Sequence, residues 1–178
     1  MNRTVPTINT ARITLRAMRP GDFDRFAEIW AMPDVVRHIG GVPRDRATSW
    51  IRFLTNAGHW QMTGYGQWAI EYHETKEMIG HVGFFLNDRG LDADWDRVPE
   101  AGWVLVPELH GKGLGREAVK AAHDWFDRVI TGPTACLIHP ENAASLRIAE
   151  RLGYAMVDEA TYMDRPARMM LRKSVPQG

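Results

Sequence analysis

The sequence contains one cysteine, Cys136, among its 178 residues. An intrachain disulfide is therefore excluded, and so is a zinc site built on several thiolates. Proteins of a reducing compartment typically contain few cysteines, and we interpret Cys136 as a core residue of a cytoplasmic protein. The first residues lack the apolar segment of a secretory signal peptide. The longest apolar run, residues 82–86, is far shorter than the ~20 residues of a membrane span, so we expect no membrane partner.

The chain also lacks an excess of charge of either sign, because 22 basic side chains balance 22 acidic ones. Proteins that bind nucleic acid broadly carry a basic surplus, since neutralising phosphates supplies most of that affinity. We therefore expect no nucleic-acid partner, and the net charge indicates neither an anionic nor a cationic ligand. The seven histidines show no ligand spacing such as H-E-x-x-H, so we expect no metal. His81 and His139 fall in expected strands and are interpreted as hydrogen-bonded structural residues.

No repeat or Pro/Ser-rich linker divides the chain, and its length suits one domain that spans residues 1–178. Alternating apolar residues predict a first strand around residues 12–16. Two helices are expected next, from Asp22 to about Met32 and from Asp45 to about Met62, with Asp22 as a cap of the first. The residues that we expect on one face of the second helix are Trp50, Phe53, Leu54 and Ala57.

Six later runs have the pattern of strands, at residues 67–72, 78–86, 100–106, 135–139, 154–158 and 167–173. A helix between the third and fourth of these runs is predicted from one apolar stripe, made of Leu114, Ala118, Ala122, Trp125 and Val129. A strand-helix-strand unit of this length makes its two strands parallel, with a right-handed crossover. A further helix begins near Asn142 and ends at Gly153. The expected fold is mixed α/β, with helices packed on a mostly antiparallel sheet.

A glycine-rich loop precedes the helix of this strand-helix-strand unit, with glycines at positions 111, 113 and 115. Missing side chains let backbone N–H groups converge on an anion, and the helix dipole adds a favourable potential. A phosphate or diphosphate ligand is one interpretation, and a turn that needs glycine only for positive φ is the other. Two nucleotide motifs fail here. Arg116 stands where the dinucleotide fingerprint needs its last glycine, and Gly111-Lys112 is not followed by the Ser or Thr of a Walker A loop.

The segment His110 to Gly115 resembles the acetyl-CoA loop of the GNAT acetyltransferase superfamily. That loop reads Arg or Gln, any two residues, Gly, any residue, then Gly or Ala, and here His110 takes the first position. Three further segments are similar to the Rim-type branch, which acetylates the N-termini of ribosomal proteins among other substrates. They are its opening strand at Thr10–Arg16, its P-x-N-x-x-S segment at Pro140–Ser145, and its Glu-Arg-Leu-Gly-Tyr segment at Glu150–Tyr154. The four segments extend over nearly the whole chain.

The resemblance implies acetyl-CoA as co-substrate and a GNAT fold in which strand 100–106 splays from its parallel neighbour 135–139. The pantetheine arm would lie in the gap, paired with backbone groups of Val104 and Val106. Lys112 or Arg116 would add charge for the phosphates, although exposed basic residues of this kind are more often only solvated. The cofactor-binding residues implied are Val104, Leu105, Val106, His110, Gly111, Lys112, Gly113, Leu114, Gly115, Arg116, Asn142 and Ser145.

The acid and base of the implied reaction are less specifically marked. Glu100 is the candidate base, acting directly or through water, because an amine arrives protonated; a solvated carboxylate is the alternative. Ser145 is implied to contact the cofactor and to protonate the departing thiolate, but it also suits an exposed helix position. Asn142 is explained equally well as a helix N-cap. Many GNAT enzymes carry a tyrosine acid at the position of Ala149, so Ser145 or water would replace it.

The amine acceptor stays open at this stage, with a protein N-terminus or a small-molecule amine as the two interpretations. In this superfamily the acceptor is selected by the first helices with their loop, residues 31–44, and by the segment 161–167. Trp30, Trp68 and Trp103 either border that site or belong to the core. A catalytically silent CoA-binding sensor or interaction module is the alternative function. The resemblance also suggests a homodimer.

Overall fold

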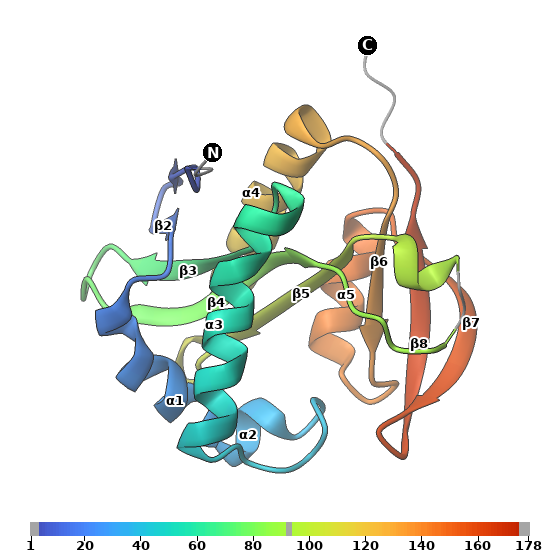
Figure 1. Ribbon diagram of the computed structural model, residues 1–178, viewed down its shortest axis with the longest axis horizontal. Coiled ribbons are helices and arrows are strands. Elements are labelled where there is room, and N and C mark those ends of the chain that lie inside the picture. The colour runs from blue at the N-terminus through green and yellow to red at the C-terminus, as the bar shows by residue number, and fades with distance from the viewer. Residues whose placement is uncertain (1–3, 92–93, 175–178) are drawn as a thin grey trace.

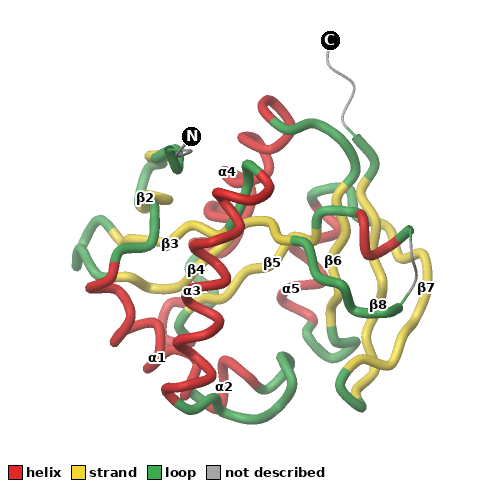
Figure 2. Tube along the Cα trace, viewed as in Figure 1, coloured by secondary structure: helices red, strands yellow, loops and turns green. Residues whose placement is uncertain are grey.

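The computed structural model describes residues 4–91 and 94–174. Within these residues, eight strands form one sheet in the order β1-β2-β3-β4-β5-β6-β8-β7 (Figures 1 and 2). Neighbouring strands are antiparallel except β5 and β6, which are parallel. The strands are β1 (Ile8–Asn9), β2 (Ile13–Arg16), β3 (Gln67–Tyr72), β4 (Met78–Phe85), β5 (Glu100–Leu105), β6 (Thr134–Ile138), β7 (Ala155–Tyr162) and β8 (Arg165–Arg172). This mixed sheet confirms the predicted fold class.

The α-helices are α1 (Phe23–Ala31), α2 (Pro33–Val36), α3 (Arg46–Thr63), α4 (Leu114–Val129) and α5 (Ala143–Arg151). Helices α1 and α3 lie in front of the sheet in Figure 1, and α4 lies behind it. Phe26 of α1 stacks on His81 with ring centroids 5.3 Å apart, whereas Phe126 of α4 packs on Phe84 at 4.3 Å. His81 and Phe84 are three residues apart on β4 and therefore point to opposite faces. Among the described helices, none is long and apolar enough to cross a membrane.

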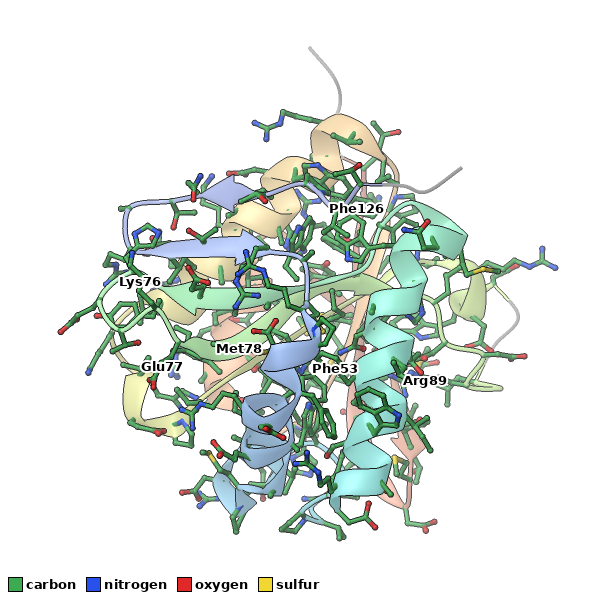
Figure 3. All side chains as sticks on the ribbon, turned by 60° about the vertical axis from the view of Figure 1, so that its left-hand side comes forward. Phe53, Lys76, Glu77, Met78, Arg89 and Phe126 are labelled. Atoms are coloured by element: carbon green, nitrogen blue, oxygen red, sulfur yellow. The ribbon has the colours of Figure 1, made fainter. Side chains whose placement is uncertain are left out.

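The buried face of α3 differs from the prediction. Its buried residues are Ser49, Phe53, Asn56 and Trp60. Phe53 does lie between α1 and α3 (Figure 3), but Trp50 is 43% and Leu54 50% exposed, and Ala57 is exposed too. The predicted apolar stripe of α3 is displaced by about one residue from the face that is buried. Hydrophobicity could not locate that face, because two of its residues are polar. Of these two, Asn56 borders a cavity, whereas Ser49 is fully buried.

Local signals at the helix ends have mixed outcomes. Asp45 and Asn142 each accept a hydrogen bond from the backbone N–H three residues later, at 2.7 and 3.2 Å, so both are side-chain N-caps. Asp22 precedes α1 as predicted, but its carboxylate binds the buried guanidinium of Arg16 at 2.8 Å. Cys136 is 1% exposed, and burial raises the pKa of its thiol, which confirms its interpretation as a core residue.

The C-terminal hairpin is longer than predicted, because β7 and β8 continue to a tight turn at Met163 and Asp164. Both turn residues have positive φ, +52° and +58°, a conformation that glycine or asparagine usually marks in a sequence. Here the turn residues are Met163 and Asp164, so Asp164 was the only local signal. The short elements β1 and α2 were also missed. Val129 is 57% exposed, so the buried stripe of α4 ends before the last residue of the helix.

Candidate functional site

The parallel strands β5 and β6 pair at one end and separate at the other. Glu100 stands opposite Ala135, and Ala135 N donates to Pro99 O at 2.9 Å. Both strands continue beyond this point, to Leu105 and Ile138, without a further pair between them among the described residues. The predicted splay is therefore present. It leaves backbone groups of β5 without a strand to pair with, which is the opening that an extended ligand can fill.

The backbone groups of β5 that face this opening are not the ones predicted. Val106 N donates to Ile79 O at 2.9 Å, and Val106 O accepts from Leu109 N at 3.2 Å, so both groups of Val106 are occupied. Hydrogen-bonded pairs alternate along an antiparallel ladder. Val104, opposite His81, therefore also directs its backbone groups to β4. The prediction that Val104 and Val106 pair with pantetheine is wrong by one residue.

Trp103 and Leu105 have the opposite phase and direct their backbone groups toward β6. The carbonyl of Leu105 accepts a hydrogen bond from His110 Nε2 at 2.9 Å, which ties the glycine loop to the end of β5. His110 thus holds the loop in place through its side chain, in the position where the family motif has Arg or Gln. The amide groups of Trp103 and Leu105 are the ones available to a ligand in the gap.

The glycine loop ends directly at the N-terminus of α4. Gly113 is the N-cap with φ +80°, a left-handed conformation that favours glycine. The first bond of the helix runs from Glu117 N to Gly113 O at 3.0 Å. The amides of Leu114, Gly115 and Arg116 therefore precede the hydrogen-bonded part of the helix and point out of its N-terminus, where the dipole favours an anion.

The segment between β1 and β2 contacts this loop from outside. The Arg12 side chain donates to Lys112 O at 2.8 Å and pairs with Glu117 at 2.7 Å. Thr10 Oγ1 donates to the same Glu117 carboxylate at 2.6 Å. Burial alone would raise the pKa of Glu117, but the hydrogen bonds from Thr10 and Arg12 lower it below its usual value. The Thr-x-Arg segment noted in the sequence thus positions the glycine loop relative to the sheet.

A cavity of about 400 Å³ runs from this loop to the gap beside β5. Eight of the predicted cofactor residues line it: Val104, Leu105, His110, Gly111, Gly113, Gly115, Arg116 and Ser145. The other four predicted cofactor-binding residues do not line this cavity: Val106, Lys112, Leu114 and Asn142. Leu114 is 1% exposed and packs in the core. Arg147 and Arg151 of α5, which the sequence analysis missed, add two cations to the lining; their i, i+4 spacing on a helix was the available signal.

A second cavity, of about 180 Å³, lies on the other side of Trp103 and Ser145, which line both cavities. Trp103 Nε1 donates to Ser145 Oγ at 3.1 Å, so the hydroxyl hydrogen of Ser145 is available to another acceptor. Ser145 also starts α5, since its N–H donates to the Asn142 cap. The Trp103 indole and the Ser145 hydroxyl therefore lie at the junction where the two cavities meet.

The walls of the second cavity come from segments far apart in the sequence. The 31–44 segment contributes His38, Ile39, Gly40 and Arg44, and the 161–167 segment contributes Tyr162, Met163, Arg165, Pro166 and Ala167. A Cβ atom at Gly41 would lie 2.1 Å from an Arg165 nitrogen, so the two segments touch. Trp30, at 2% exposure, also lines this cavity, whereas Trp68, at 0%, belongs to the core. We refer to this space as the acceptor cavity.

Glu100 lies in the acceptor cavity and is 6% exposed, so it is not a solvated strand end. Both of its carboxylate oxygens accept hydrogen bonds from Arg89, at 2.8 and 2.7 Å. The Arg89 guanidinium also stacks on the Tyr162 ring at 4.2 Å. A two-point ion pair of this kind holds the carboxylate in one orientation.

The deep end of the acceptor cavity contains His81, which is 4% exposed. Its Nδ1 lies 2.7 Å from Gln67 Oε1, an atom that only accepts, so Nδ1 carries the proton and Nε2 does not. Nε2 has no partner among the described residues. Burial, then the charges of Arg52 and Arg44, lower the pKa of His81 to about 3. The ring therefore stays neutral and presents a hydrogen-bond acceptor.

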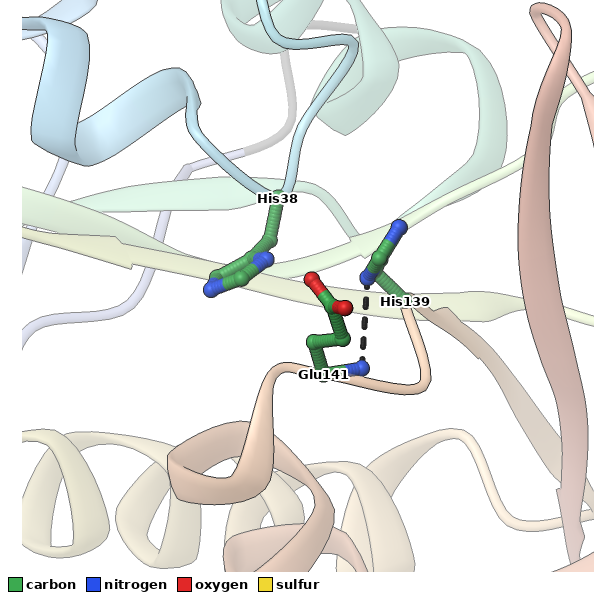
Figure 4. A group of neighbouring side chains, drawn as sticks. All are labelled: His38, His139 and Glu141. Carbon is green, nitrogen blue, oxygen red and sulfur yellow. Dashed lines mark hydrogen bonds between the residues drawn. The ribbon is translucent and has the colours of Figure 1, made fainter.

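Two more histidines meet at the mouth of this cavity. His38, His139 and Glu141 bring one ligand atom each within 4.8 Å of one another (Figure 4), a juxtaposition that sequence spacing did not show. Burial and the nearby His139 lower the pKa of His38, so this ring is neutral near pH 7. Glu141 N donates to His139 Nδ1 at 3.2 Å, which leaves Nε2 of His139 for other partners. The trio supplies three ligand atoms, one fewer than a structural zinc site uses.

The chain matches known proteins over most of its length. The family model described as "Acetyltransferase (GNAT) domain" matches residues 12–155. A GNAT-family acetyltransferase from Bordetella pertussis superposes with a TM-score of 0.86 at 26% identity, covering 94% of this chain and 99% of that one. N-acetyltransferase YoaA of Bacillus subtilis is 25% identical over 84% of this chain and 82% of its own. A Vibrio cholerae spermidine N-acetyltransferase, solved with CoA and spermine, shares the fold at 18% identity and TM-score 0.73, covering 93% and 97%.

Proposed function

Because the chain belongs to the GNAT acetyltransferase family, we propose that it transfers the acetyl group of acetyl-CoA to a primary amine by direct attack on the thioester. The observation that carries this proposal is the junction of two cavities at Trp103 and Ser145. One cavity begins at a helix N-terminus suited to a diphosphate and follows the splayed strand. The acceptor cavity ends at the same junction, and its walls include the 31–44 and 161–167 segments.

In this proposal the coenzyme occupies the cavity of about 400 Å³. The amides of Leu114, Gly115 and Arg116 bind the diphosphate at the start of α4. The side chains of Arg116, Arg147 and Arg151, which line the same cavity, supply positive charge for the phosphate groups. The backbone groups of Trp103 and Leu105 pair with the pantetheine amides as a neighbouring strand would.

The thioester then lies at the junction, and the amine attacks its carbonyl carbon from the acceptor cavity. The N–C bond forms, the C–S bond breaks, and the sulfur leaves as a thiolate. A backbone N–H of Trp103 or Leu105 stabilises the oxyanion that develops. Ser145 donates its hydroxyl hydrogen toward the leaving sulfur, since Trp103 already donates to its oxygen.

The attacking amine must be neutral, and the proton that it loses goes to Glu100 through a water. Arg89 occupies one lone pair of each Glu100 oxygen, and a carboxylate has further lone pairs that can accept from a water. Deprotonating an unperturbed lysine amine at pH 7 costs roughly 4.6 kcal/mol, but an α-amine costs only about 1 to 1.4 kcal/mol. Glu100 therefore matters more for a strongly basic acceptor than for a weakly basic one.

The test is turnover with acetyl-CoA and a panel of amines, with release of free thiol and the acetylated product both measured. We expect thiol release that depends on the amine, and its loss without loss of CoA binding in Glu100→Gln and Ser145→Ala. CoA binding by the wild-type protein is measured in parallel by calorimetry. Tight CoA binding without turnover on any amine would refute the enzyme and favour a CoA-binding sensor.

A further inference from the structure

The acceptor cavity has a strong excess of positive charge, although the chain as a whole has a formal net charge of zero. Its lining includes one carboxylate, Glu100, and four arginines, Arg44, Arg52, Arg89 and Arg165. Glu100 is paired with Arg89. The other three guanidinium groups form no ion pair with any described residue. The cavity wall is therefore cationic in a way that the composition does not show.

Two of these cations are held close together on one indole ring. The guanidinium carbon of Arg44 lies 4.3 Å from the Trp30 ring centroid, and that of Arg52 lies 5.2 Å from it. Burial and the charge of Arg52 lower the pKa of Arg44 to about 10. Burial, followed by the charge of Arg89, lowers the pKa of Arg52 as well. Two partly desolvated like charges destabilise the fold unless something neutralises them.

The polar atoms beside these arginines are also without partners. Asn56 Nδ2 and Trp30 Nε1 are buried donors that bond to none of the described residues, and both side chains line the acceptor cavity. Asn56 and Trp30 are 4% and 2% exposed. A buried donor without an acceptor is costly, and a ligand in this cavity that supplies an acceptor would remove that cost. Two guanidinium groups and two neutral donors together form a site for an oxyanion.

We infer that the acceptor is a small amine that also carries an anionic group, a carboxylate or a phosphate, bound by Arg44 and Arg52. The inference rests on the proposed function, because it names the chemistry of the amine that the enzyme acetylates. The unprotonated Nε2 of His81 provides an acceptor in the same cavity for an N–H of this ligand. A polycation such as spermine, bound by the Vibrio cholerae fold relative, would meet repulsion here.

The arginines of the acceptor cavity also favour the neutral, reactive form of the bound amine. A cationic wall disfavours the ammonium form of a bound amine, because like charges nearby lower the pKa of a basic group. The bound anionic group offsets only part of this effect, since three guanidinium groups lack a partner among the described residues. The cavity thus selects the acceptor and also increases the fraction of it that can attack the thioester.

The first test compares acceptors that share an amine and differ in the anion. Suitable pairs are amino acids with their carboxamides, and O-phosphoethanolamine with ethanolamine; spermidine is the polycation. We expect kcat/KM to be at least about tenfold higher for the charged member of a pair, as charge-assisted hydrogen bonds predict. The pair with the larger ratio identifies the anion as carboxylate or phosphate. Ratios near one, with acetyl transfer intact, would overturn the inference and leave the proposed function standing.

The second test uses variants with a matched control. Arg44→Gln and Arg52→Gln should reduce the ratio within each pair toward one. Arg46→Gln should leave it unchanged, because Arg46 pairs with Asp24 at the surface and does not line the cavity. An unchanged ratio in both cavity variants would refute the assignment of these arginines.

A third measurement does not depend on turnover. With the diphosphate site filled by saturating CoA, inorganic phosphate should raise the thermal midpoint of the wild-type protein and of Arg46→Gln, but not that of the double variant R44Q/R52Q. Cooperative thermal unfolding of the double variant without phosphate shows that it folds. If no amine is acetylated, the proposed function fails, while a phosphate shift confined to proteins with both arginines still supports the anion site. An equal shift in all three proteins would refute the site.

Discussion

Replacing Gly113 by leucine should abolish tight binding of the coenzyme without unfolding the protein. Gly113 caps α4 with φ +80°, and the amides that follow it are the proposed diphosphate donors. A Cβ atom at this position would lie 3.4 Å from an Arg12 nitrogen and otherwise meets open space. A leucine side chain would therefore either occupy the space of the diphosphate or displace Arg12, which holds the loop.

The Gly113→Leu substitution should change two separately measurable quantities, the stability of the fold and the affinity for the coenzyme. A non-glycine residue in the left-handed region costs about 1–2 kcal/mol of folding stability. Each hydrogen bond lost to a charged phosphate costs about 1.5–3 kcal/mol of binding, which corresponds to roughly a 10–150-fold increase in Kd. We expect the Kd for CoA to rise at least about tenfold, for one lost bond, and the stability to fall only by the backbone cost.

Gly153→Leu is the matched control for the backbone cost. Gly153 has φ +88°, no atom within 4 Å of its Cβ position, and an exposed location after α5. It lines neither cavity. Both variants should lose similar stability in urea denaturation, and calorimetry should show weakened CoA binding only for Gly113→Leu. Wild-type affinity in a folded Gly113→Leu protein would refute the diphosphate assignment and with it the placement of the coenzyme.

Three further predictions follow from the described contacts. Glu100→Gln should lower kcat by roughly 10²-fold, because the carboxylate accepts the proton of the amine; an unchanged kcat would contradict that role. Tyr154→Phe should cost about 1–3 kcal/mol in urea denaturation, because it leaves the buried Nε2 of His123, 2.8 Å from the Tyr154 hydroxyl, without a donor. Burial lowers the pKa of His123 to about 4, against about 6.5 when unfolded. The stability that neutral His123 contributes to the folded state is therefore fully present above pH 6.5 and is lost as the pH falls toward 4. The loss is on the order of 3 kcal/mol, and equal stability at pH 7 and 4.5 would contradict it.

Features that depend on neighbours in the sequence were predicted well. The glycine loop between a strand and a helix, the cap at Asn142, the start of a helix at Asp45, and the crossover that makes β5 and β6 parallel all follow from local pattern and connection length. These features also define the fold and the coenzyme end of the site, because both are built from backbone geometry. Backbone donors at a helix N-terminus are present whatever the surrounding side chains are.

The sequence did not determine which residues of a strand or a helix face a given neighbour. Strand β5 directs alternate backbone groups to opposite neighbours, and its apolar pattern does not reveal which residues face the gap, so Val104 and Val106 were chosen in place of Trp103 and Leu105. The inward face of α3 was misplaced for a related reason. Its polar residue Asn56 is buried because a cavity lies there, and hydrophobicity cannot mark such a position.

The charge of the acceptor cavity was decided by tertiary structure alone. Arg44 lies just before α3 and Arg52 within it, whereas Arg89 and Arg165 come from two distant segments that only folding brings together. A formal net charge of zero adds all charges regardless of position. Electrostatic energy depends on the distance between charges and on their burial, so a balanced composition is compatible with a strongly cationic pocket. The sequence determined the glycine loop at the N-terminus of α4, and the packing of distant segments determined the charge of the acceptor cavity.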